Sequence, residues 1–214
     1  MTNTTPAHTT AAHPHVPDAE EAVSEFEILE TSVRELAIDK GLFSGADHRQ
    51  WLEWMDGATP AGGASLVARA WIDPEYKARA LANGTAAAQE IGINMYDRDP
   101  LVIMENTPTV HNLVVCTLCS CYPRAVLGLP PDWYKSPSYR RRAVRWPRPL
   151  LAEFGTIIPP EVEIRVHDSN ANMRYLVMPM RPEGTEGWSE AQLASTVTRD
   201  TLIGVAVPAA QPGQ

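Results

Sequence analysis

The sequence predicts an α+β protein, in which a helical N-terminal arm precedes an α/β body with a small mixed sheet and a loop of clustered cysteines. Three observations favour this fold class. Apolar residues recur with a period near 3.6 over much of residues 25–95. Beyond residue 100 this pattern gives way to short runs of β-branched and apolar residues, as in strands. The 19 prolines, many of them in the C-terminal half, indicate turns and extended segments there.

On this basis the 214 residues divide into four segments. Residues 1–24 are rich in Thr, Ala, His and Pro, and we expect a disordered tail. Residues 25–95 form the helical arm, residues 96–208 the body that carries the cysteine loop, and residues 209–214 a second tail. The apolar faces of the arm could cover a partner chain or pack on their own body, and the sequence leaves both open.

The arm is expected to contain helices separated by short turns. Pro60–Gly63 has the composition of a turn. Proline interrupts helix interiors, so Pro74 should divide the third stretch into two helices, with Asp73 placed to cap the second. The expected helices are Ser24–Gly41, His48–Met55, Ser65–Asn83 and an extension over Thr85–Ile91.

The body is expected to combine strands with short helices. The turn Asp168–Asn172 predicts a hairpin between the third and fourth strands. Helices are expected from Pro130-Pro131, over Ser138–Phe154 with a proline-broken middle, and over Ser189–Arg199 with Ser189 as N-cap. The expected strands are 101–104, 110–115, 161–167, 174–178 and 201–207.

Charge and hydropathy exclude several functions. The formal net charge is −8, which argues against general binding to nucleic acid or to an anionic membrane. Apolar runs are far shorter than the roughly 18 residues that a transmembrane helix needs. Residues 1–18 lack the charged start and apolar block of a secretory signal, so we expect a cytoplasmic protein by default. The tail histidines (His8, His13 and His15) receive no function.

All three cysteines fall within one hexapeptide, Cys116-Thr117-Leu118-Cys119-Ser120-Cys121, which we call the claw loop. An odd number in one cluster is not a disulfide framework, and clustered thiols indicate a metal site or redox chemistry. A structural zinc site usually has four protein ligands from two separated pairs, and this chain has no second pair. His111 could be a fourth ligand, although it falls within a predicted strand, and zinc remains an alternative at this point.

The spacing of the claw loop also permits another coordination chemistry. Three sulfurs can surround one point, and the backbone nitrogens of Ser120 and Cys121 come near the same point. Binding through a backbone nitrogen requires loss of its proton, which a trivalent cobalt or iron ion favours and zinc does not. Five protein donors leave one position for water or substrate. Such a centre is negatively charged and needs positive neighbours, either Arg124 or arginines from another chain.

The segment around the cysteines resembles the metal-binding loop of nitrile hydratase α subunits and of the thiocyanate hydrolase γ subunit. The resemblance covers roughly residues 25–208. It rests on the run Val114–Pro123 and on further matches at Glu105–Thr107, Val110–Asn112, Leu127–Pro130, Trp133-Tyr134, Leu151–Gly155, Glu163–Val166, Arg181–Thr185 and Thr198–Asp200.

This resemblance implies a set of site residues. Cys116, Cys119 and Cys121 would supply sulfur ligands, and Ser120 and Cys121 would supply amide nitrogens. The family's oxidation pattern would make Cys119 a sulfinic acid and Cys121 a sulfenic acid, so Cys119 and Cys121 are the catalytic candidates. Cobalt members usually carry Thr at the position of Thr117, so cobalt(III) is favoured over iron(III). One or two partner subunits would supply arginines to the claw loop.

The resemblance implies hydration of a small-molecule nitrile to its amide. Arg124 follows the Cys-Tyr-Pro sequence at a position where nitrile hydratases usually have Trp. An arginine at this position resembles the sequence of thiocyanate hydrolase. Thiocyanate hydrolysis to carbonyl sulfide and ammonia is therefore the alternative, although a three-subunit toyocamycin nitrile hydratase belongs to the same branch. A subunit that binds metal without catalysing a reaction is a second alternative.

Other polar residues have weaker interpretations. The arginine cluster (Arg140, Arg141, Arg142, Arg145 and Arg148) could attract an anionic substrate, bind carboxylates of a partner or form a solvated helix face. Glu163, Arg165 and Asp168 could surround the claw loop or lie on a surface strand. His111 is expected to be structural, and Tyr122 and Trp133 are expected in the core or in a pocket wall.

Overall fold

The computed structural model describes residues 24–95, 100–119 and 121–210. The described residues fall into two compact units, which divide between His48 and Arg49. Residues 1–23 and 211–214, which make up most of the two predicted tails, lie outside the described residues. The predicted division at residue 95 stays a prediction. The α+β fold class is confirmed, since helices accompany two small sheets and the three cysteines cluster in one loop.

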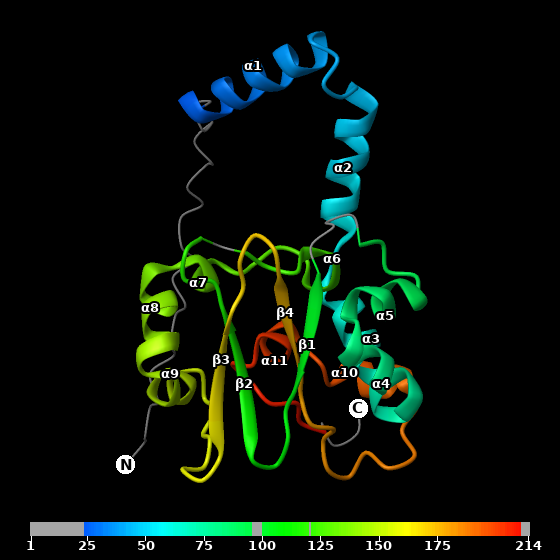
Figure 1. Cartoon of the computed structure of the whole chain (residues 1–214), viewed down its shortest axis with the longest axis vertical. Coiled ribbons are helices and arrows are strands. Elements are labelled where there is room, and N and C mark those ends of the chain that lie inside the picture. The colour runs from blue at the N-terminus through cyan, green and yellow to red at the C-terminus, as the bar shows by residue number, and fades with distance from the viewer. Residues whose placement is uncertain (1–23, 96–99, 120, 211–214) are drawn as a thin grey trace, which may run out of the picture. The chain divides into compact units, whose positions relative to one another are not determined.

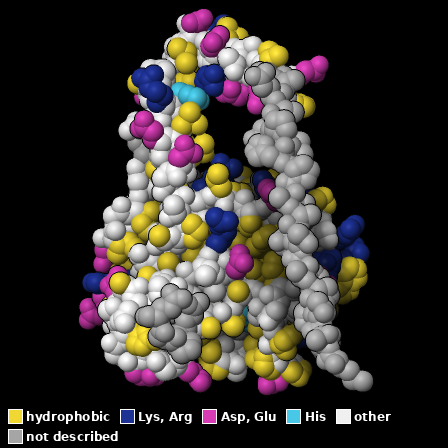
Figure 2. All heavy atoms as spheres, turned by 180° about the vertical axis from the view of Figure 1, so that it is seen from behind, with side chains coloured by type: hydrophobic (Ala, Val, Ile, Leu, Met, Phe, Trp, Pro, Cys, Tyr) yellow, Lys and Arg dark blue, Asp and Glu magenta, His cyan; other side chains and the backbone are white. Residues whose placement is uncertain are grey.

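Helix α1 (Glu25–Asp39) begins where the sequence predicts it. The Ser24 hydroxyl accepts from the Glu27 amide, and the Glu27 carboxylate accepts from the Ser24 amide, so two otherwise unpaired donors are satisfied. No residue of α1 is buried. Hydrophobic side chains lie among the charged ones over this helix (Figure 2). The exposed apolar residues of α1 include Phe26, Leu29, Val33 and Leu36, which recur at helical spacing.

The second unit holds most of α2 (Gly45–Gly57) and three further helices, α3 (Pro60–Ile72), α4 (Pro74–Ala82) and α5 (Gly84–Glu90). The predicted break is confirmed: Asp73 Oδ1 accepts from the Glu75 and Tyr76 amides and caps α4.

The prediction of a turn at Pro60–Gly63 is wrong, because these residues begin α3. Thr59 accepts from the Ala61 amide, and Pro60 occupies a first-turn position where its missing N–H costs nothing. Gly63 is buried, and a Cβ there would lie 2.7 Å from the Leu202 side chain and 2.9 Å from the Val126 carbonyl oxygen. The glycine therefore serves close packing of the helix and not a turn.

The four strands form two parallel pairs. β1 (Leu101–Glu105) pairs with β4 (Arg174–Met178), with Leu101 opposite Arg174. β2 (Val110–Val115) pairs with β3 (Glu163–Asp168), with Val110 opposite Glu163. Figure 1 shows α8 and α9 on one side of the strands and α3, α4 and α5 on the other. The buried strand β2 lies at the centre of this unit, and its C-terminal end leads directly into the claw loop.

The predicted hairpin between the third and fourth strands is wrong in its pairing. The turn itself forms, with an antiparallel bridge between Asn170 and Met173 and an Asn170 side chain that accepts from the Asn172 amide. Beyond this bridge the strands separate, and each pairs with a strand from far earlier in the chain. The pairing covers the buried strand β2, which a local hairpin would leave without a partner.

The last predicted strand, Thr201–Val207, is also wrong. Thr198 and Thr201 form a capping box, so the segment begins as helix α11 (Arg199–Ile203) and ends at Gly204. Ser189 caps α10 as predicted, but α10 stops at Ser195. The remaining helices of the body are α6 (Arg124–Leu127), α7 (Asp132–Lys135), α8 (Pro137–Arg145), α9 (Pro147–Glu153) and α10 (Glu190–Ser195).

Buried polar side chains join the two sheets near the start of β2. Asn106 Oδ1 accepts from the backbone and side-chain nitrogens of Asn112, and Asn112 Oδ1 lies 2.8 Å from His167 Nε2. His111 Nε2 lies 2.8 Å from the Gly204 carbonyl oxygen and Nδ1 faces the Asn106 amide nitrogen. These side chains therefore form hydrogen bonds with one another and with the backbone, as polar groups in a protein interior generally do. No helix among the described residues is long and apolar enough to cross a membrane.

Candidate metal centre

The claw loop begins at the buried end of β2. Val115 and Cys116 are fully buried, whereas Cys119 is exposed and Cys121 is intermediate. The three sulfur atoms lie within 4.8 Å of one another. Cys116 Sγ is 3.5 Å from Cys119 Sγ, which is 3.2 Å from Cys121 Sγ. These separations are far longer than the roughly 2.05 Å of a disulfide bond. The loop therefore brings three sulfurs, none of them in a disulfide, close to one point.

The sulfur spacing can be compared with that of known kinds of metal site. Thiolates bind metal at about 2.3 Å, so neighbouring sulfurs lie about 3.3 Å apart at octahedral angles and about 3.8 Å apart at tetrahedral angles. The 3.2 Å separation matches the octahedral spacing, and the 3.5 Å separation lies between the two values. Ser120 lies outside the described residues, so its predicted contribution has no structural account. The sulfur donors that are described fit a thiophilic metal ion.

Two side chains hold the claw loop by its backbone. The Thr117 amide donates to Asp168 Oδ1 at 2.8 Å, and the Thr117 hydroxyl donates to Asp168 Oδ2 at 2.5 Å. At the other end of the loop, the Tyr134 hydroxyl donates to the Cys121 carbonyl oxygen at 3.0 Å. Asp168 ends β3 and Tyr134 belongs to α7, so distant elements fix both ends of the loop.

Burial and neighbouring sulfurs make the Cys121 thiolate unfavourable in the metal-free chain. Burial and the hydrogen bond with Cys119 raise the pKa of Cys121 to about 12, while the charge of Arg174 acts in the opposite direction. Arg124, the positive neighbour that the sequence offered, instead directs Nη1 to the Met55 sulfur at 3.6 Å. A positively charged metal ion held by the three sulfurs would compensate the charge of the thiolates.

A family model described as "Nitrile hydratase, alpha chain" matches residues 24–206. The chain belongs to this nitrile hydratase alpha-chain family. It is 55% identical to the thiocyanate hydrolase subunit gamma of Thiobacillus thioparus over 204 residues, covering 90% of this chain and 83% of that protein. It is also 55% identical over 175 residues to a low-molecular-weight cobalt-containing nitrile hydratase subunit alpha of Rhodococcus rhodochrous, covering 81% and 84%.

A solved structure agrees with the fold of this alpha-chain family member. The structure is of a recombinant thiocyanate hydrolase with partially modified cobalt centres. It superposes with a TM-score of 0.82 at 53% identity, and the match covers 90% of this chain and 96% of that one. At this level of identity and coverage, the likeness includes the segment that carries the claw loop.

A cluster of aromatic side chains packs next to the claw loop of this nitrile hydratase alpha-chain homologue. Tyr122 and Tyr134 meet edge to face with ring centres 5.1 Å apart, and Trp133 packs against Tyr139 and Phe154 at 4.9 Å. The expectation that Tyr122 and Trp133 belong to the core is confirmed, because Tyr122 is buried and Trp133 packs on the core. The Tyr139 hydroxyl donates to the Val114 carbonyl oxygen at 2.6 Å and so holds the strand that precedes the loop.

The other predicted residues separate by position. Asp168 reaches the claw loop, whereas Glu163 and Arg165 pair with each other at 2.8 Å on the exposed part of β3. His111 is buried and bonded to Gly204, as a structural residue is. Sequence reasoning missed Tyr134 as a contact of the claw loop, and it also missed Arg174. The only sequence signal for Tyr134 was its place in the Trp133-Tyr134 match.

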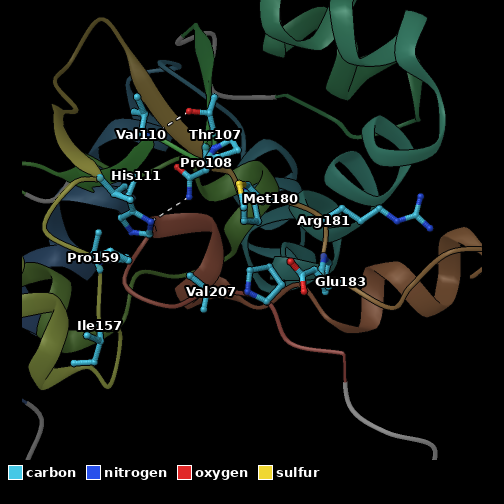
Figure 3. Close-up of a pocket in the computed structure, with 16 residues that line it drawn as sticks. Thr107, Pro108, Val110, His111, Ile157, Pro159, Met180, Arg181, Glu183 and Val207 are labelled. Atoms are coloured by element: carbon cyan, nitrogen blue, oxygen red, sulfur yellow. Dashed lines mark hydrogen bonds between the residues drawn. The ribbon is translucent and has the colours of Figure 1, made fainter.

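An apolar cavity lies at the opposite end of the strands from the claw loop. Its volume is about 380 Å³, and its wall includes His111, Ile157, Met180 and Val207 (Figure 3). The buried His111 ring is held by Asn106 and Gly204, and no cysteine lines this cavity. This cavity therefore does not include the sulfur atoms of the claw loop.

Proposed function

We propose that the chain is the metal-carrying alpha subunit of a nitrile hydratase, which adds water to a nitrile to give the amide. The observation that carries the proposal is the convergence of three cysteine sulfurs in the claw loop of a nitrile hydratase alpha-chain family member. The proposed ligands are the sulfurs of Cys116, Cys119 and Cys121 and the backbone nitrogens of Ser120 and Cys121. Cobalt(III) is the proposed ion, because relatives at 55 and 56% identity are named cobalt-containing.

The exposure of the three sulfurs supports different roles for them. Cys116 is fully buried and would act as a ligand alone, whereas Cys119 and Cys121 are accessible from outside. Accessible thiolates oxidise most readily, which agrees with the expected sulfinic acid at Cys119 and sulfenic acid at Cys121. When bound, the ion would supply Lewis-acid activation of the substrate or of water. Asp168 and Tyr134 would keep the sulfurs of the loop in fixed positions.

The proposal includes one or two partner subunits. The relatives are named as subunits, and α1 exposes an apolar stripe that a partner surface would cover. Partner arginines would compensate the negative charge of the centre, since Arg124 points to Met55. The proposal also places the enzyme in the cytoplasm, where thiols stay reduced until the site is loaded.

Thiocyanate hydrolase subunit gamma is the second candidate. Arg124 favours it, and the identity of 55% to such a subunit equals the identity to a nitrile hydratase alpha subunit. The two functions differ in product: an amide from a nitrile, or carbonyl sulfide and ammonia from thiocyanate.

The decisive experiment is metal analysis with intact-mass measurement on the chain produced with its partner subunits in cobalt-supplied cells. We expect about one cobalt per chain and a mass gain of about three oxygen atoms. This mass gain should be lost in the Cys119→Ser and Cys121→Ser variants. Product analysis with a nitrile and with thiocyanate then assigns the reaction. Bound zinc with three unmodified thiols would contradict catalysis and leave a metal-binding subunit.

A further inference from the structure

A second hollow lies beside the claw loop, between that loop and helix α8. Its volume is about 400 Å³, and we call it the arginine hollow. It is lined by Thr117, Pro137, Arg140, Arg141, Val144 and Arg145. Thr117 belongs to the claw loop, and the other residues lie on α8. The hollow therefore borders the proposed metal centre while remaining separate from its sulfur donors.

The arginines of this hollow form a concentrated positive charge in an acidic chain, whose formal net charge is −8. On α8, Arg142 forms an ion pair with Glu153. Arg140, Arg141 and Arg145 form no ion pair with any described residue. The Arg140 Nε atom is buried and has no hydrogen-bond partner in the described part of the chain. Leaving a charged group short of acceptors is costly, and an anion that contacts the partly exposed side chain of Arg140 would compensate its charge.

Apolar side chains accompany these arginines. Val144 lines the hollow with 51% of its surface exposed, and Trp146, which follows α8, is 54% exposed. Figure 2 shows Lys and Arg side chains next to hydrophobic ones at the edge of the molecule where α8 lies. A free anion would satisfy the guanidinium groups but leave these apolar side chains in water. Arginine and tryptophan together are typical of protein interfaces.

From this combination we infer that the arginine hollow docks an acidic segment of a partner protein, with carboxylates on the guanidinium groups and an apolar side chain against Val144. The inference deepens the proposed partnership and rests on it. Docking at this position would cover one side of Thr117 and so shield the neighbouring claw loop from water. Arginine pairs with carboxylates through two parallel hydrogen bonds, which gives such a contact a defined orientation.

Fluorescence anisotropy with the full chain tests the inference. The probe is a fluorescein-labelled peptide in which leucine is flanked on each side by glutamates, and the control peptide has glutamines in their place. We expect the glutamate peptide to bind at least tenfold more tightly than the glutamine peptide. The double variant Arg140→Gln/Arg145→Gln should lose at least tenfold in affinity for the glutamate peptide. The matched control Arg34→Gln/Arg165→Gln removes the same charge outside the hollow and should change the affinity less than twofold.

Two further arms keep the test decisive. Arg140 is partly buried, so Arg141→Gln/Arg145→Gln provides a variant confined to exposed side chains if the first pair disturbs folding. Equal loss in the hollow and control variants, or equal binding of both peptides, would overturn the inference. Competition by sodium acetate or sulfate at constant ionic strength, with the peptide binding no better than these ions, would identify a small-anion site and also overturn it. The assay measures no catalysis, so its failure leaves the hydratase proposal standing.

Discussion

Two residues outside the cysteine motif determine how the claw loop is held. Asp168 accepts from both the amide and the hydroxyl of Thr117, and Tyr134 donates to the Cys121 carbonyl oxygen. The cysteines themselves were predictable, because their spacing is local. Asp168 was only one of several alternatives in the sequence, and the role of Tyr134 was not foreseen. Such contacts depend on how α7 and β3 pack, and local spacing carries no information about that.

Replacing Tyr134 by Phe tests this arrangement. Tyr134→Phe leaves the Cys121 carbonyl without its donor, and Tyr139→Phe does the same to Val114 within β2. Both changes should lower the free energy of unfolding by about 1–3 kcal/mol, as is typical when a buried group loses its partner. Only Tyr134→Phe should also release the metal to a chelator several-fold faster, measured by absorbance and metal analysis. Equal release from both variants would show that Tyr134 acts on general stability alone.

At the scale of single elements, the helix boundaries follow local chemistry, and the sequence therefore predicted most of them. Asp73 and Ser189 accept hydrogen bonds from first-turn amides, as expected. Ser24, where the sequence predicted a helix to begin, does the same. The errors occurred where packing decides. Gly63 looks like a turn residue but lies in a helix against Leu202, and β3 leaves its own turn to cover β2.

Asp73 provides a test of one helix boundary. Asp73→Ala removes the acceptor for the Glu75 and Tyr76 amides at the start of α4. The free energy of unfolding in urea should fall by roughly 0.5–2 kcal/mol. Asp56→Ala removes an exposed carboxylate elsewhere and should change it by less than about 0.5 kcal/mol. Equal effects in the two variants would mean that the cap contributes nothing.

The apolar stripe of α1 provides a second test at this scale. Leu29→Lys/Val33→Lys places charge on the stripe, whose residues are already 59 and 58% exposed in the chain itself. The variant should therefore retain the helix content and unfolding midpoint of the chain but bind its partner subunit at least tenfold more weakly. Thr31→Lys lies on the opposite face of the helix and serves as the control. Calorimetric titration with the partner measures the difference, and unchanged affinity would remove α1 from the interface.

At the scale of the whole second unit, we expect the fold to depend on the polar side chains that join the two sheets. These are Asn106, His111, Asn112 and His167. Burial lowers the pKa of His111 and of His167 from the usual 6.5. The unfolded chain therefore takes up protons below about pH 6.5 that the folded chain does not yet bind. The free energy of unfolding should then decrease as pH falls below that value, by at most about 1.4 kcal/mol per pH unit for each histidine.

Urea unfolding between pH 7.5 and pH 5.5 measures this dependence. The decrease should become smaller in His111→Gln, which no longer titrates, and should persist in the matched variant His48→Gln. A free energy of unfolding that stays constant or increases as the pH is lowered over this range would contradict the assignment. The sequence could not predict this group, because His167 reaches Asn112 only through the parallel pairing of β2 with β3.

The exposed stripe on α1 also has a consequence for how a cell handles this chain. A helix that displays Phe26 at 82% exposure and Leu29 at 59% is the kind of surface that chaperones and proteases recognise. We expect surplus copies that find no partner to be degraded, while assembled copies persist. The amount of enzyme would then follow the scarcer subunit, and balanced synthesis of the subunits would matter more than strong expression of any one.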